Sequence, residues 1–212
     1  MARPLTHSLP STTPEAGVRE HFGLSQDELG RYLGVSRALV AHFEAGRRRP
    51  SRLADQRLAR LAALLPPPTG HGPVAPHWPA LATPTLPAPP PLPAFDGEWA
   101  ARPLQRRLLQ VQAQAARLRW ELHQASKGAK LQQRRAWALA QLRAALPPAD
   151  LADAAELAHL HRWLTVLAAD IEAAAPTPAS RAAQALLVLR IQALEYEAAA
   201  LGPLLTAHNP PE

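Results

Sequence analysis

A proline-rich run constrains this chain more than any other feature. Residues 66–93 hold twelve prolines within 28 positions. Proline has no amide hydrogen to donate and fixes its own φ, so such a run forms neither a helix interior nor a central strand. Its composition is typical of a semi-rigid spacer of polyproline II character. We therefore predict a flexible leader over 1–13, a first module over 14–65, a linker over 66–97, a second module over 98–205 and a tail over 206–212.

The second module has the apolar spacing of long helices. Apolar residues recur at alternating steps of three and four, the period of a heptad seam. Glycine and proline punctuate helices, so we expect about four helices, with breaks at Gly128, Pro147-Pro148 and Pro176. The expected seam of the last helix is Ala182, Leu186, Leu189, Ala193, Tyr196 and Ala200. Short connections favour antiparallel neighbours, which predicts a long-helix bundle or a coiled-coil-like domain.

Charge is spread unevenly along the chain, whose net charge is +6. Residues 98–146 carry ten Lys/Arg against two Asp/Glu, whereas residues 147–212 carry three against eight. A basic excess favours polyanions such as nucleic acid. The acidic segment also suits the basic one electrostatically, either within one chain or across a dimer.

Several classes of protein conflict with the composition. The absence of cysteine removes disulfides, thiolate zinc sites and cysteine nucleophiles. No apolar run approaches the roughly 20 residues that span a bilayer. His159 and His161 are two apart and would face different sides of a helix, so they do not suggest a metal site. With no glycine-rich phosphate loop or nucleophile elbow in view, we predict a soluble, cytoplasmic protein that is not an enzyme and holds no cofactor or metal.

Residues 23–50, GLSQDELGRYLGVSRALVAHFEAGRRRP, contain two short helical patterns joined by a Gly-Val pair. Ser25 and Glu28 have the spacing of a capping box. Gly34 suits a tight turn that needs a positive φ, and Ser36 suits the cap of the helix that follows. The apolar positions expected to pack inside the first module are Val18, Phe22, Leu29, Leu33, Val40, Phe43, Leu53, Leu58, Leu61 and Leu65.

The same stretch resembles the XRE/Cro-type, phage-repressor-like helix-turn-helix domain. The resemblance rests on LSQDELGRYLGVSRALVAHFEAGRRRPS, residues 24–51, together with Arg19 upstream. It covers about residues 14–65 and implies an all-α domain of four to five helices that binds double-stranded DNA in the major groove. Gly30 departs from the pattern, because the family usually has alanine there.

The resemblance also implies which residues meet DNA bases. Residues 36–45 match the recognition helix, and the positions that would face base edges are Ser36, Arg37, Ala38 and His42. Arg37 is the candidate for reading a guanine, because its planar fork matches the O6 and N7 acceptors. Ala38 could touch a thymine methyl group.

Other roles implied by the resemblance concern phosphates and structure. The expected phosphate contacts are Gln26, Arg47, Arg48 and Arg49. Such contacts fix the register of a protein on DNA without reading its sequence. Arg19 and Glu44 match a pair that commonly forms a partly buried salt bridge, so we expect a structural role for both.

Together these observations predict a sequence-specific DNA-binding transcriptional regulator, acting as a repressor, associated with the nucleoid and dimeric through its C-terminal helices. One alternative is an antitoxin-like DNA-binding protein whose C-terminal helices bind a protein partner. Another is a helical scaffold or interaction protein.

Overall fold

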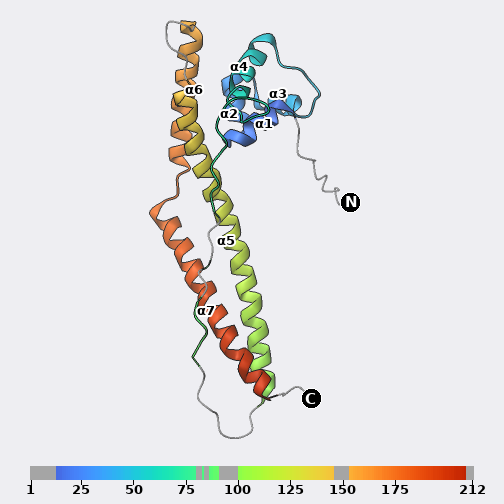
Figure 1. Cartoon of the computed structure of the whole chain (residues 1–212), viewed down its shortest axis with the longest axis vertical. Helices are drawn as coiled ribbons and strands as arrows, with labels where there is room; N and C mark the ends of the chain where they lie inside the picture. The colour runs from blue at the N-terminus through green and yellow to red at the C-terminus, as the bar shows by residue number, and fades with distance from the viewer. Residues whose placement is uncertain (1–12, 80–82, 84–85, 91–99, 146–152, 209–212) are drawn as a thin grey trace. The chain divides into compact units, whose positions relative to one another are not determined.

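The computed structural model describes residues 13–79, 83, 86–90, 100–145 and 153–208. Within these residues every regular element is an α-helix, which confirms the predicted all-α class (Figure 1). In chain order the helices are α1 Pro14–Phe22, α2 Gln26–Leu33, α3 Arg37–Glu44, α4 Arg52–Ala62, α5 Ala101–Ala144, α6 Ala154–Ala173 and α7 Pro178–His208. None of the described helices combines the length and the apolar character needed to cross a membrane.

The chain divides into two compact units. The first unit comprises Met1–Trp78 and Leu131–Ala175, and the second comprises Pro79–Lys130 and Pro176–Glu212. Helix α5 contributes to both, since the division falls within it. The domain boundaries expected from the proline content stay a prediction. Residues 1–12 of the predicted leader 1–13 and residues 209–212 of the predicted tail 206–212 lie outside the described part of the chain.

The four short helices begin and end at residues suited to those positions. Thr13 caps α1 by accepting a hydrogen bond from the amide of Ala16 at 3.5 Å, and Pro14 occupies the first turn, where no amide hydrogen is needed. Ser51 caps α4 in the same way through the amide of Ala54. Gly23 ends α1 with a left-handed φ of 65°, a conformation that glycine adopts without steric cost.

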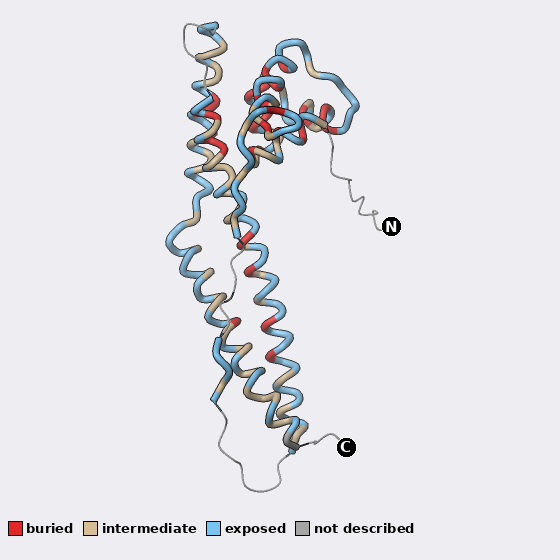
Figure 2. Tube along the Cα trace, in the orientation of Figure 1, coloured by how far each residue is buried: buried red, intermediate tan, exposed pale blue. Residues whose placement is uncertain are grey.

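The core of the first unit draws on six helices, α1 to α6 (Figure 2). Residues of α1 to α4, among them Val18, Leu29 and Val40, are buried in one cluster with residues from elsewhere in the chain. The contributors from outside the short helices include Ala138, Leu139 and Leu142 of α5 and Trp163, Leu164 and Leu167 of α6. Residues 131–144 of α5 and helix α6 therefore complete the core in which the short helices pack.

Leu53 was predicted to pack inside and does not. Leu53 is 49% exposed, because the buried face of α4 starts one position later, at Ala54, and continues through Leu58 and Leu61, with Leu65 buried just after the helix. The other apolar positions predicted for this module are buried.

The second unit pairs part of α5 with α7. Arg107 binds Glu197 at 2.5 Å, and Arg119 binds Glu195 at 2.7 Å, so a basic stretch of α5 faces acidic residues of α7. Among the described residues of this unit, the buried apolar ones are Val111, Ala115, Leu122 and Ile191.

Two details of the predicted helices were wrong. Helix α5 runs through Gly128 without interruption, so residues 100–145 and 153–208 hold three helices rather than about four. One glycine costs a helix only about 1 kcal/mol, which a helix of 44 residues tolerates. The predicted seam of α7 lies outward, with Leu186 and Leu189 exposed, whereas Ile191 is buried. Because α7 is apolar on more than one side, periodicity could not decide which side packs.

Candidate nucleic-acid interface

The turn between α2 and α3 is built from local contacts. Ser25 and Glu28 form a capping box in which the Ser25 amide donates to Glu28 Oε2 at 2.6 Å and the Glu28 amide donates to Ser25 Oγ at 3.2 Å. Gly34 ends α2 with a φ of 76°. A Cβ atom on Gly30 would lie 2.8 Å from the backbone oxygen of Val35, so glycine allows the turn to approach α2 this closely. These features orient α3 against α2.

Helix α3 has one buried and one exposed side. Val40 and Phe43 are buried in the domain, whereas Arg37, Ala38 and His42 are exposed. The predicted base-facing residues of the helix therefore share its outward side. Such an arrangement leaves their side chains accessible to a DNA groove.

Ser36 precedes α3 as its N-cap. Its Oγ accepts a hydrogen bond from the amide of Leu39 at 3.3 Å. The hydroxyl thus has a structural role in starting the helix, and the residue itself is exposed. Its predicted contact with a base would be made beside this cap.

An exposed basic loop follows α3. Gly46 adopts a φ of 67°, and the amide of Arg47 donates to the carbonyl of His42 at 2.9 Å, which ends the helix. Arg47, Arg48 and Arg49 are all exposed. Because all three cations are exposed, they suit contacts with DNA phosphates. Such contacts do not depend on the DNA sequence.

A buried carboxylate connects the start of α2 with α1 and α3. Glu44 Oε1 accepts a hydrogen bond from Arg19 Nε at 2.6 Å, and Oε2 accepts one from Gln26 Nε2 at 2.8 Å. The Glu44 side chain is 8% exposed, so the Arg19 cation compensates a charge that is largely removed from water. Gln26 has two amide hydrogens, and only one is needed for Glu44. The other suits the predicted phosphate contact at the N-terminus of α2.

The opposite side of α2 is held by helices outside the motif. The indole N–H of Trp163 donates to the carbonyl of Glu28 at 2.9 Å, and Arg135 binds the Glu28 carboxylate. His159 Nε2 lies 2.8 Å from the carbonyl oxygen of Tyr32. The Tyr32 ring packs on Trp163 with ring centroids 4.6 Å apart, and burial raises the pKa of Tyr32 to about 12.

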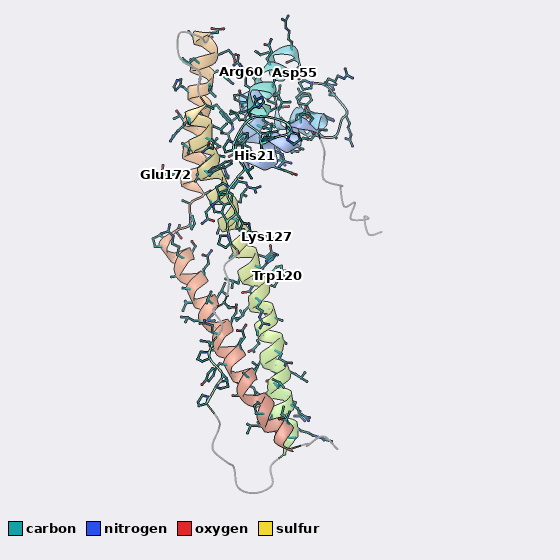
Figure 3. All side chains as sticks on the ribbon, in the orientation of Figure 1. His21, Asp55, Arg60, Trp120, Lys127 and Glu172 are labelled. Carbon is teal, nitrogen blue, oxygen red and sulfur yellow. The ribbon has the colours of Figure 1, made fainter. Side chains whose placement is uncertain are left out.

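Arg57 is a buried charge that connects α4 with α2 and α6. Its Nη2 binds Glu156 Oε1 at 2.7 Å, and its Nη1 donates to the carbonyl of Tyr32 at 3.3 Å. Arg60, labelled on α4 in Figure 3, binds the other oxygen of Glu156 at 3.2 Å. The hydrogen bond from Arg57 lowers the pKa of the Glu156 carboxyl. The pair is therefore ionised at neutral pH and fixes α6 to the short helices.

Few local patterns in the sequence indicate this supporting layer. Arg57 lies three residues after buried Ala54, so its position on the inner face of α4 could have been noticed. Its partner Glu156 is 99 residues away in the chain, and no local pattern indicates such a pairing. The partner Arg135 of Glu28 is equally remote.

One known protein family matches the part of the chain that contains α2 and α3. Residues 18–65 match a family model described as helix-turn-helix. The match spans most of α1, all of α2 to α4, and ends at Leu65, so α5 to α7 lie beyond it. No curated protein and no solved structure matches the chain.

Proposed function

Residues 18–65 form an XRE/Cro-type helix-turn-helix DNA-binding domain, and from this premise we propose that the chain is a transcriptional repressor that recognises a specific operator. The observation that carries the proposal is the outward side of α3, where Arg37, Ala38 and His42 are exposed together. Operator occupancy alone can block transcription, so repression needs no further activity.

We assign different roles to the residues of this interface. Arg37 reads a guanine through paired hydrogen bonds, while Ala38 and His42 contact neighbouring bases in the major groove. Gln26 binds a phosphate at the N-terminus of α2, and the loop arginines 47–49 bind phosphates beyond α3. The role proposed for Gln26 agrees with its contacts. Its side chain is held by Glu44, and Glu44 is in turn bound by Arg19.

Dimerisation completes the proposed mechanism. One small domain makes few phosphate contacts and binds weakly, whereas two domains held together gain affinity through their effective concentration. Two recognition helices would then address half-sites about one helical turn apart. We assign the dimer contact to the C-terminal helices.

In-vitro selection of binding sites from random DNA tests this function with the full-length chain. We expect a recurrent sequence arranged as two inverted half-sites with a fixed spacing. Recovery of unenriched DNA would reject specific recognition. A single unpaired half-site would retain the recognition and reject the dimer.

A further inference from the structure

Helix α7 carries an apolar stripe most of whose residues are exposed. We define the outer stripe as Ala182, Leu186, Leu189, Ala193, Tyr196 and Ala200, which recur at alternating steps of four and three. Leu186 is 52% exposed, Leu189 60% and Tyr196 38%. The stripe has the period of a coiled-coil seam, which fits another helix.

The outer stripe and the buried side of α7 are on opposite faces of the helix. Ile191 is fully buried, and Leu189 and Ala193 lie two residues to either side of it, rotated by about 200°. Helices that are apolar all round are normally buried all round. The contacts with α5 cover one side of α7, and Figure 2 shows that most positions along this helix are exposed or only partly buried.

We propose that a second copy of this chain covers the outer stripe, with the two α7 helices packed antiparallel about a two-fold axis near Leu194. The inference rests on the proposed function only in naming the surface through which that regulator dimerises. The residues that flank the outer stripe indicate that its partner is a second copy of the chain.

Only two charged residues flank the outer stripe. Arg190 and Glu197 occupy equivalent positions one heptad apart on the same flank, and the remaining flanking positions are Ala183, Ala185, Gln192 and Ala199. In an antiparallel coiled coil, equivalent flanking positions face one another. The two-fold axis near Leu194 places Arg190 of each copy opposite Glu197 of the other.

Other registers lose this match. A shift by one heptad in either direction places Arg190 opposite Arg190, or Glu197 opposite Glu197. A parallel pairing places Arg190 opposite Ala185 and Glu197 opposite Gln192. Charge complementarity therefore selects one antiparallel arrangement of two identical helices, because interfacial charges fix register more than they add affinity.

The same register also complements side-chain size. It places Tyr196 against Ala193 of the other copy, and Leu189 against Ala200. Alternating large and small residues interdigitate across a helix interface without voids or overlap. The symmetry is closed, so the contact produces dimers and not filaments.

The surroundings of the stripe leave the charged flank accessible. Arg190 and Ala193 line an open hollow together with Gln114, Arg117 and Glu121 of α5. Both carboxylate oxygens of Glu197 accept hydrogen bonds from Arg107, at 2.5 and 2.8 Å. The Glu197 side chain remains 36% exposed, and each carboxylate oxygen has a second lone pair, so the group can also meet a cation from outside. Residues 86–89 lie beside Tyr196 of the stripe and Ala199 of the other flank, and Tyr196 is still 38% exposed.

A mixing experiment with two charge reversals tests the arrangement. R190E alone places glutamates opposite glutamates in the homodimer, and E197R alone places arginines opposite arginines. We expect each variant to raise the dimer dissociation constant by roughly tenfold, since two attractive pairs become repulsive. A mixture of the two restores both opposite-charge contacts, so equimolar mixing should recover dimers with the parent affinity in analytical ultracentrifugation.

R181E is the matched control, because it reverses the same charge on α7 away from the flanks of the stripe. It should dimerise like the parent. Circular dichroism of each variant reports whether the helices remain intact, and L189D provides a second disruption within the stripe itself. Unchanged dimerisation of R190E, E197R and L189D would overturn the proposal, as would failure of the mixture to recover dimers.

The measurements distinguish a wrong dimer surface from a wrong proposal of DNA-binding function. A chain that is dimeric but indifferent to these changes dimerises elsewhere, and its DNA recognition is untouched. A parent chain that stays monomeric at micromolar concentration, with and without DNA, overturns both the surface and the dimer. Retained binding of R190E to an isolated half-site would show that α3 still recognises DNA.

Discussion

Arg37 and Arg48 are both exposed cations, yet they lie at different parts of the proposed interface. Arg37 is the first residue of α3, and Arg48 lies in the loop beyond its end. A guanidinium at a base edge affects one sequence position, whereas a guanidinium at a phosphate affects all sequences alike. The two residues therefore provide separable tests of the proposed roles.

We predict that Arg48→Ala weakens binding to the selected operator and to unrelated DNA by a similar factor. The slope of log affinity against log salt concentration should fall by about one, because one phosphate contact and its released counterion are lost. Fluorescence anisotropy at several salt concentrations measures both quantities. A loss confined to the operator would instead assign Arg48 to base recognition.

Glu156 offers a test of the layer behind the interface. Glu156→Gln removes the charge facing Arg57, whose side chain is 9% exposed, and should lower the free energy of unfolding by about 1–2 kcal/mol at pH 7. Asp170→Asn is the matched control. Its pair with Arg31 is more than a third exposed on both sides, so a loss of about 0–1 kcal/mol is expected. Equal losses in urea unfolding would contradict the assigned importance of burial.

The contribution of Glu156 should also depend on pH. Its pKa is lowered in the folded chain from the ordinary value of 4.5, so the contribution is fully present above pH 4.5 and is lost as pH falls through the folded value. The difference in unfolding free energy between the parent and Glu156→Gln should therefore shrink in acid. A difference that grows below pH 4.5 would contradict this sign.

Among the elements, α6 is the one whose packing side most directly supports the motif. Leu167 is 1% exposed within the core of the first unit, whereas its neighbour Val166 is 39% exposed. Leu167→Ala should lower the free energy of unfolding by about 2–5 kcal/mol, whereas Val166→Ala should change it by no more than about 0.5 kcal/mol. Hydrogen exchange should accelerate in α2 for the first variant only. Unchanged exchange in α2 would show that α6 does not stabilise the motif.

Elements with strong local signals were predictable from the sequence. The capping box at Ser25 and Glu28 and the glycine at position 34 determine where α2 starts and ends, and neither depends on distant residues. Gly128 misled the prediction, because a glycine can break a helix but a long helix absorbs its cost. The α7 seam was wrong because two faces of that helix carry heptad spacing, and only its partners distinguish them.

Some residues of the candidate site could likewise be predicted from the sequence, and others could not. The outward positions of α3 follow from its period, and the resemblance to a known family implied their roles. The support from Arg135, Glu156 and Trp163 depends on contacts more than 90 residues away in the chain. Neither spacing nor composition encodes such contacts, so they emerged only in the folded structure.

At the scale of the whole molecule, assembly and recognition should be separable. We predict that R190E loses affinity for the two-half-site operator while keeping the parent's affinity for an isolated half-site. Only the operator benefits from two connected domains, because the second domain then binds at high effective concentration. Electrophoretic mobility shift with both DNA lengths measures this. Equal losses on both DNAs would mean that the change damages recognition itself.

Site selection with the full-length Arg37→Ala variant tests the claim that α3 reads DNA sequence. Loss of one guanine contact should cost about 1–3 kcal/mol and relax the preference at a single position of each half-site, with the rest of the motif preserved. Arg48→Ala, selected in parallel, should recover the parent motif. Recovery of an unchanged motif by Arg37→Ala, with unchanged affinity, would contradict the claim.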